Sequence, residues 1–269
     1  MTDRRIAFIN EKGGTCKTTL AVNTAAWFAQ KKGLRVLLID LDTQGHAGKS
    51  LGIDVRSLPT NVFHWLTNTN VTLNDVVRAT AVPNLFVVPS YKQMANFPLQ
   101  VANQVDRDTL LRERMKEVDE AGYELVVFDS PPSLGLTTTN ILLAATEVVV
   151  PVATTYLSLD GCAEMSETVR RVSEKDNLGL FISLVVPTLY RKTALADEVL
   201  ERLGRYFPGR LARQPLALNV AIDEAQSHGK TIWEYAPWSR GATLLQSVAE
   251  DVDAAGRRSD RRHASSAAQ

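Results

Sequence analysis

Short runs of apolar, often β-branched residues alternate along this chain with longer stretches in which apolar residues recur at helical spacing. The short runs predict buried strands at residues 5–9, 35–40, 85–89, 124–129, 147–152 and 181–187, with a weaker strand near Leu216. The longer stretches predict helices at 17–30, 73–78, 108–120, 138–145, 159–175 and 193–206, and a last helix from Arg240 to about Ala255. Such alternation is typical of βαβ units in a parallel sheet.

Helices between most strands require right-handed crossovers, which place helices on both faces of the sheet. We therefore predict an α/β fold with a doubly wound, mostly parallel sheet. No stretch is rich enough in Gly, Ser or Pro to act as a linker, so residues 1–255 are expected to form a single domain.

Residues 256–269 differ in character from the rest of the chain. They contain four arginines and almost no bulky apolar residues, so we predict a disordered basic tail. A solvated end is the simpler interpretation and a nonspecific anion-binding arm the alternative. The tail lacks the apolar face of a membrane anchor, and no run of about 18 apolar residues exists elsewhere, so no membrane partner is expected.

Composition narrows the function classes further. The 30 Lys and Arg residues balance 30 Asp and Glu residues, so any nucleic-acid binding must come from a local patch. The two cysteines, Cys16 and Cys162, are far apart and lack metal-ligand spacing, which argues against a zinc site and for a reduced, cytoplasmic protein. His46 and His228 also lack ligand spacing and are interpreted as polar loop residues.

The segment 10–19, N-E-K-G-G-T-C-K-T-T, follows the first predicted strand and opens the first predicted helix. This layout is typical of a phosphate-binding loop, in which backbone N–H groups and the helix N-terminus surround phosphate oxygens. In such a loop Lys17 reaches the phosphates and the Thr18 hydroxyl ligates magnesium. The candidate nucleotide-binding residues are Lys12, Gly13, Gly14, Thr15, Cys16, Lys17, Thr18 and Thr19.

The loop departs from the usual G-x-x-x-x-G-K-[ST] pattern at two positions. Glu11 and Cys16 stand where glycines are expected, and a second lysine, Lys12, precedes the glycine pair. A side chain at position 16 could alter turnover or be oxidised, although we favour the simpler interpretation that it faces away and is tolerated.

Two further buried strands end in carboxylates. Asp40 and Asp42 end the run L-L-I-D-L-D-T-Q-G, and Asp129 ends L-V-V-F-D-S-P-P. Ligands of open α/β sheets bind beyond the carboxyl ends of the strands, so these side chains are expected in one crevice with the phosphate loop. There a carboxylate can hold magnesium or orient an attacking water.

Together these segments resemble the ParA/MinD-type ATPases with a deviant Walker A motif, K-G-G-x-x-K-[ST]. The segment D-L-D-T-Q-G is similar to the family's D-x-D-P-Q-G, and D-S-P-P-S-L-G to its D-x-P-P-S-L-G. Residues 219–230, N-V-A-I-D-E-A-Q-S-H-G-K, are similar to N-V-R-L-S-E-A-P-S-H-G-K of the ParA branch. The resemblance covers roughly residues 4–252.

The resemblance implies an ATPase that uses ATP and Mg²⁺ and forms an ATP-dependent homodimer. The signature lysine, Lys12, would cross to the partner's phosphates, which makes it catalytic together with Lys17 and Asp42. Lys17 would bind phosphate within its own subunit, and Asp42 would orient the attacking water.

The remaining site residues are assigned by position in the same motifs. Thr18, Asp40 and Asp129 match the residues on the magnesium side, and Asn219 falls where the family contacts adenine. Family members hydrolyse ATP slowly and are stimulated by a basic peptide of a ParB-like or other adaptor. They bind DNA nonspecifically and position plasmids, chromosomes or other cargo, so a nucleoid-associated location is expected.

Leu218 and Ala221 stand near positions where ParA members often carry DNA-contacting arginines, which weakens the transfer of DNA binding. The basic residues that could replace them are Arg191, Lys192, Arg202, Arg205, Arg210 and Arg213. Two alternatives stay open: a MinD-like or other nucleotide-switched regulator, and a nucleotide-binding adaptor with little hydrolysis. A nitrogenase-reductase-like enzyme is disfavoured, since the cysteines for a shared iron–sulfur cluster are missing.

Overall fold

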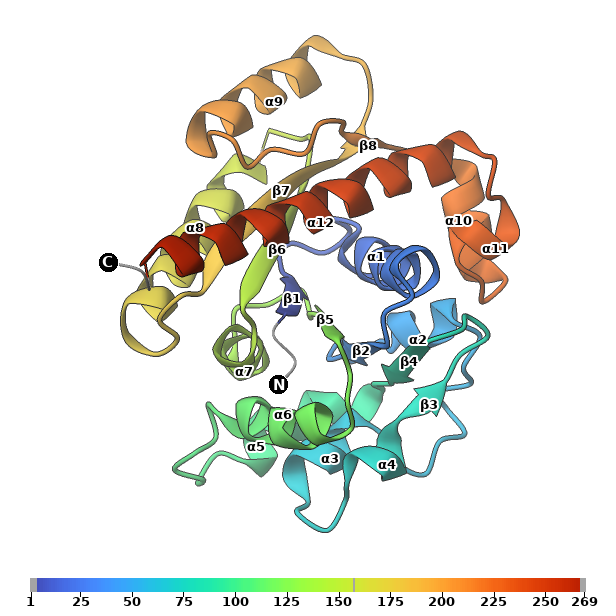
Figure 1. Ribbon diagram of the computed structural model, residues 1–269, viewed down its shortest axis with the longest axis vertical. Coiled ribbons are helices and arrows are strands. Elements are labelled where there is room, and N and C mark those ends of the chain that lie inside the picture. Colours follow the sequence, from blue (N-terminus) through green and yellow to red (C-terminus); the bar gives the residue numbers. More distant parts are fainter. Residues whose placement is uncertain (1–3, 157, 267–269) are drawn as a thin grey trace.

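The computed structural model describes residues 4–156 and 158–266, and a single eight-stranded sheet organises them (Figure 1). The strand order is β3-β4-β2-β5-β1-β6-β7-β8, and every neighbouring pair is parallel except β3 with β4. The strands are β1 (Arg4–Phe8), β2 (Val36–Asp40), β3 (Arg78–Ala79), β4 (Leu85–Val88), β5 (Leu125–Asp129), β6 (Glu147–Ala153), β7 (Phe181–Tyr190) and β8 (Leu216–Ala217). The predicted doubly wound, mostly parallel sheet is confirmed.

Long helices cover both faces of the sheet, and short helices fill the connections. The longer helices are α1 (Lys17–Lys32), α6 (Leu110–Glu120), α7 (Leu136–Ala144), α8 (Ser158–Lys175), α9 (Ala194–Tyr206), α10 (Val220–Ser227) and α12 (Arg240–Ser266). The shorter ones are α2 (His46–Ser50), α3 (Val62–Thr67), α4 (Leu73–Val76), the 3₁₀ turn η1 (Lys92–Asn96), α5 (Phe97–Gln100) and α11 (Ile232–Tyr235).

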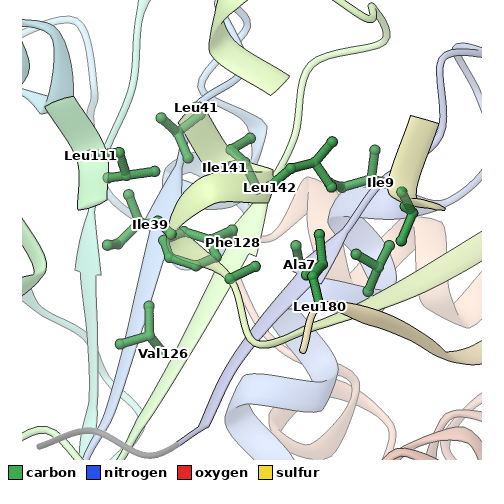
Figure 2. Packing of buried hydrophobic residues seen from close by; sticks show 14 of the residues in the cluster. Ala7, Ile9, Ile39, Leu41, Leu111, Val126, Phe128, Ile141, Leu142 and Leu180 are labelled. Atoms are coloured by element: carbon green, nitrogen blue, oxygen red, sulfur yellow. The ribbon is translucent and has the colours of Figure 1, made fainter. Parts of the chain in front are cut away.

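Alternate residues of the central strands divide the core into two layers. In β1, Ile6 and Phe8 face the layer formed with α1, α10 and α12, whereas Ala7 faces the opposite layer. Figure 2 shows part of that opposite layer, in which residues of the sheet meet residues of α6 and α7. Because strands buried on both faces need apolar residues at every position, the sheet strands read as continuous apolar runs.

Two differences from the predicted elements have local causes. The helix expected at 73–78 stops at Val76, because Arg78 turns into β3 and pairs antiparallel with β4. The last helix was expected to end near Ala255 and to be followed by a disordered tail, but α12 is helical through Ser266, so that prediction is wrong for 256–266. The single domain assigned to residues 1–255 stays a prediction.

Among the described residues, no helix combines the length and the apolar run that a membrane crossing requires.

Candidate functional site

The phosphate loop joins β1 to α1, which are positioned by the two layers of the core. Gly14 has φ 70° and Cys16 has φ 65°, both in the left-handed region. A glycine takes this conformation without steric cost, whereas the Cβ of a cysteine crowds the following carbonyl oxygen. The turn at Cys16 directly precedes Lys17, so it orients the first backbone N–H groups of α1 toward the loop's interior.

A cavity of about 640 Å³ opens at this loop. Because β1, β2 and β5 are neighbours in the sheet, the residues that follow their carboxyl ends meet at its rim. The cavity is lined by Gly13, Gly14, Thr15, Cys16, Lys17, Thr18, Thr19, Asp42, Gln44, His46, Lys49, Ser50, Pro132, Asp223, Gln226 and Ser227. Seven of the eight predicted loop residues thus line it, and Lys12 is the exception within the described part of the chain.

Lys17 is the buried lysine of this cavity, which Lys49 also lines. Lys17 Nζ donates a hydrogen bond to the Lys12 carbonyl oxygen at 2.9 Å, and its side chain is buried. Burial lowers the pKa of the Lys17 ammonium, while the negative charges of Asp129 and Asp42 oppose that change. An ammonium that donates to a backbone carbonyl oxygen, with two carboxylate charges nearby, can exchange the carbonyl contact for a phosphate oxygen.

Asp129 has the chemistry of a magnesium-side ligand. It is fully buried, and neither carboxylate oxygen has a hydrogen-bond partner among the described residues. Burial raises the pKa of Asp129 to about 7, although the nearby Thr18 hydroxyl lowers it. An orphaned buried carboxylate beside a threonine hydroxyl fits the few protein ligands that Mg²⁺ takes when water and phosphate oxygens supply the rest.

Asp40 is equally buried, but its oxygens are engaged. Its Oδ1 accepts from the backbone N–H of Asp42 and its Oδ2 accepts from that of Ala47, both at 3.0 Å. Burial and the charge of Asp129 raise the pKa of Asp40 well above its usual range. The structure therefore gives Asp40 a role in fixing the loop that carries Asp42, and its magnesium role stays a prediction.

Asp42 lies at the cavity wall, and its water-orienting role stays a prediction. Its Oδ1 accepts from the backbone N–H of Gln44 at 3.0 Å and from the Thr43 hydroxyl at 3.4 Å. These two contacts, both on one oxygen, fix the carboxylate at the edge of the cavity. The other oxygen, Oδ2, is the one that can accept a hydrogen bond from a water.

Lys12 lies outside this cavity and next to α8. A Cβ placed on Gly161, in the first turn of α8, would approach Lys12 Cε to 3.3 Å, so the lysine side chain passes close to the α8 backbone. The Lys12 backbone N–H donates to Asn10 Oδ1 at 2.9 Å. The side chains of the two lysines are therefore separated: Lys17 lines the cavity, and Lys12 lies beside Gly161 of α8.

Cys16 combines a strained backbone with a partly buried side chain. Its side chain packs against the layer that contains α1, and its thiol lies near Thr188 and Asp223. Burial raises the pKa of the Cys16 thiol to about 11, with a further contribution from the Asp223 charge. The thiolate is the reactive form, so this environment disfavours oxidation.

Asn219 is not among the described residues that line the cavity. Its Oδ1 accepts from the Ala221 backbone N–H at 3.1 Å, which makes it the N-cap of α10. This contact gives Asn219 a structural role in the observed state, and the predicted adenine contact is untested.

Several candidate DNA-binding residues are engaged in ion pairs. Arg202 pairs with Glu198 at 2.6 Å and Arg205 with Glu201 at 2.5 Å, each along the exposed surface of α9. Arg213 is paired with Glu250 and Asp251 of α12. In contrast, Arg191 and Lys192 are exposed, and neither forms a salt bridge with a described residue.

Sequence reasoning missed one whole wall of the cavity. This wall is formed by α2 and α10, and its residues are His46, Lys49, Ser50, Asp223, Gln226 and Ser227. The sequence did contain a signal for the α10 part of this wall, because Asp223, Gln226 and Ser227 belong to the C-terminal motif at 219–230. No comparable signal marked His46, which was interpreted as a loop residue but begins α2.

Comparison with known proteins agrees with this geometry. An AAA domain family model matches residues 3–182. The sporulation initiation inhibitor protein Soj of Bacillus subtilis is 37% identical over 252 residues, which are 93% of this chain and 98% of that protein. The chromosome-partitioning ATPase Soj of Treponema pallidum is 34% identical, over 93% of this chain and 96% of its own length. This chain belongs to the ParA/MinD-type partition ATPases.

A solved structure extends the family match to the ligands. Cobyrinic acid a,c-diamide synthase from Mycobacterium smegmatis, with a bound ATP analog and magnesium, has a TM-score of 0.80 and is 28% identical, over 92% of each chain. Structures homologous to this chain thus bind ATP or ADP with magnesium. Magnesium fits the Asp129 carboxylate, which has no hydrogen-bond partner among the described residues. The nucleotide phosphates fit the loop in which Gly14 and Cys16 have positive φ.

Proposed function

We propose that the chain is an ATP-switched partition ATPase that dimerises around ATP and positions DNA or another cargo. The observation that carries this proposal is the separation of the two signature lysines. Lys17 lies within the cavity, whereas Lys12 lies beside Gly161 of α8. A sandwich dimer requires a second lysine outside its own nucleotide cavity, since that lysine would offset charge on the transferring phosphoryl group bound by the other subunit.

Each group of residues in the cavity would have its own role in ATP hydrolysis. Backbone N–H groups from Gly13 to Thr18 would hold the phosphates, and Lys17 would exchange its carbonyl contact for a phosphate oxygen. Asp42 would orient the attacking water from the cavity wall. Magnesium, held on the Thr18 and Asp129 side, would offset charge on the phosphates.

Partner-stimulated turnover and nonspecific DNA binding are parts of the same proposal. The Soj relatives named above are a chromosome-partitioning ATPase and a sporulation inhibitor, which supports a role in DNA positioning. Among the candidate DNA-binding residues, Arg191 and Lys192 are exposed and can contact backbone phosphates without first breaking a described ion pair. We propose a nucleoid-associated location on the same grounds.

The decisive measurement is the molar mass by light scattering after size exclusion, with ATP and with ADP. ATP is expected to double the mass of the wild-type protein, and ADP is expected to leave it unchanged. Lys12→Ala should abolish partner-stimulated phosphate release, whereas Lys31→Ala, an exposed lysine at the end of α1, should not. An unchanged mass with ATP would exclude the sandwich dimer.

A nucleotide-binding adaptor with little hydrolysis is the second candidate. Cys16 favours it, because a residue with a Cβ stands in the left-handed turn of the phosphate loop, where a glycine would be free of strain. Phosphate release in single turnover separates the two candidates. The adaptor would be supported if the wild type dimerises with ATP but releases no phosphate, and if Cys16→Gly restores phosphate release.

A further inference from the structure

The wall of the nucleotide cavity formed by α10 makes a direct contact with the phosphate loop. Gln226 Nε2 donates a hydrogen bond to Thr19 Oγ1 at 2.6 Å, between residues 207 positions apart in the chain. Both residues line the cavity. Thr19 lies in the first turn of α1, next to the N–H groups that face the phosphates.

The surrounding contacts fix Gln226 in this place. Asn23, one turn after Thr19, accepts from the Ile232 backbone N–H at 3.0 Å through Oδ1 and from Trp233 Nε1 at 3.3 Å through its carbonyl oxygen. Its Nδ2 donates to the Thr19 carbonyl oxygen at 2.8 Å. Helix α11 is thereby attached to α1 at the turn that carries Thr19.

Helix α10 is attached to α11 in turn. The His228 ring stacks on the Tyr235 ring with 5.2 Å between centroids, and the Tyr235 hydroxyl donates to Glu224 Oε2 at 3.3 Å. The position of Gln226 relative to Thr19 is therefore set by the packing of three helices, and does not depend on a single flexible side chain.

The direction of the hydrogen bond decides its chemical effect. A threonine hydroxyl has one proton to donate and lone pairs that accept. Because Gln226 donates to Oγ1, the Thr19 proton must point elsewhere, and no described residue accepts it. Since Thr19 lines the cavity, its hydroxyl can direct the proton there, where a nucleotide would present anionic phosphate oxygens. Successive hydrogen bonds of this kind polarise and strengthen one another.

We propose that Gln226 is a positioning residue that makes the Thr19 hydroxyl a dedicated donor to the bound nucleotide's phosphate. The inference rests on nucleotide binding in this cavity, which the proposed function also requires. Proline stands at this position in the C-terminal motif N-V-R-L-S-E-A-P-S-H-G-K, and a proline has no donor to offer. The contact is thus a property of this chain's own sequence.

The test is the affinity for ADP, measured by isothermal titration calorimetry on the full chain. Gln226→Met keeps the length of the side chain but removes the donor, and is expected to weaken ADP binding about fivefold to tenfold. Gln226→Glu can only accept from Thr19, so it should turn the hydroxyl proton away from phosphate and weaken binding more. Gln246→Met, an exposed glutamine on α12, serves as the matched control and should bind like wild type.

A double-mutant cycle separates this role from a purely structural one. In a Thr19→Val background, which lacks the hydroxyl, Gln226→Met should cause no further loss. In a Thr19→Ser background, which keeps the hydroxyl, the loss should be the same as in the wild type. Equal effects in the Val and Ser backgrounds, or wild-type affinity of Gln226→Glu, would overturn the proposal. A wild-type protein that does not bind ADP at all would refute the proposed function itself.

Discussion

Asp40 and Asp129 are Cα partners at the ends of β2 and β5, and both are fully buried. Two carboxyl groups on adjacent parallel strands repel each other when both are ionised. The backbone N–H groups that hold Asp40 relieve part of this repulsion, whereas Asp129 has no hydrogen-bond partner among the described residues. The pair therefore favours a bound cation.

This pair predicts a pH-dependent stability in the metal-free protein. Burial raises the pKa of Asp129 from 3.8 to about 7, so the folded state holds a proton that the unfolded state has lost between these values. Stability should therefore fall as pH rises from about 4 to 7, with a slope of up to about 1.4 kcal/mol per pH unit. Asp129→Asn should remove this contribution, as measured by urea unfolding across the pH range.

Asp54→Asn, at an exposed position, controls for the loss of one negative charge. Magnesium with nucleotide should reduce the slope in the wild type, because a cation stabilises the ionised carboxylates. Identical pH slopes for the wild type and Asp129→Asn would contradict the assignment.

At position 16 we expect the glycine variant to be more stable than the alanine variant, which is the reverse of their usual order. Alanine at position 16 retains the Cβ that crowds a left-handed backbone, and glycine does not. Cys16→Gly should therefore be more stable than Cys16→Ala by about 1 kcal/mol, even though glycine costs more backbone entropy on folding. Chemical unfolding of the two variants measures the difference.

Ala163→Gly, at an exposed position inside α8, is the control, because there alanine is expected to be more stable than glycine. It should destabilise the protein by about 1 kcal/mol, as glycine does inside a helix. If Cys16→Ala were the more stable of its pair, the left-handed conformation of the loop would be disproved.

Two substitutions of Asn219 can distinguish its role as the N-cap of α10 from a contact with adenine. Asn219→Ala removes the cap of α10 and should cost about 1 kcal/mol of unfolding free energy. Asn219→Asp keeps an oxygen that can accept from Ala221, so it should retain the stability of the wild type. An adenine contact by the Asn219 amide would instead appear as weaker ATP binding in Asn219→Asp, which calorimetry with ATP and GTP would detect.

The exposed pair Arg191 and Lys192 predicts the salt dependence of DNA binding. Replacing both with alanine should lower the slope of log affinity against log salt by about 2, since each cation that neutralises a phosphate releases counterions. Binding of the ATP form to a duplex of unrelated sequence, titrated at several salt concentrations, measures this slope. Arg202→Ala with Arg205→Ala should change it less, because these arginines are paired with glutamates on α9.

All six main strands and the phosphate loop could be predicted from the sequence, because buried parallel strands leave continuous apolar runs. The two-residue strand β3 could not be predicted, since so short a pairing has no periodicity. The α2 and α10 wall was missed for a different reason. It depends on contacts such as that of Gln226 with Thr19, which only the packed helices bring together.

Because Gly161 has no Cβ, the side chains of the phosphate loop can approach the backbone of α8 closely at this position. A Cβ at this position would lie 2.6 Å from Glu11 Oε1 as well as close to Lys12. Positions 11 and 161 are therefore sterically coupled: a larger residue at 161 requires either another rotamer of Glu11 or a shorter residue at 11. Covariation between these two positions across natural sequences would record that steric constraint.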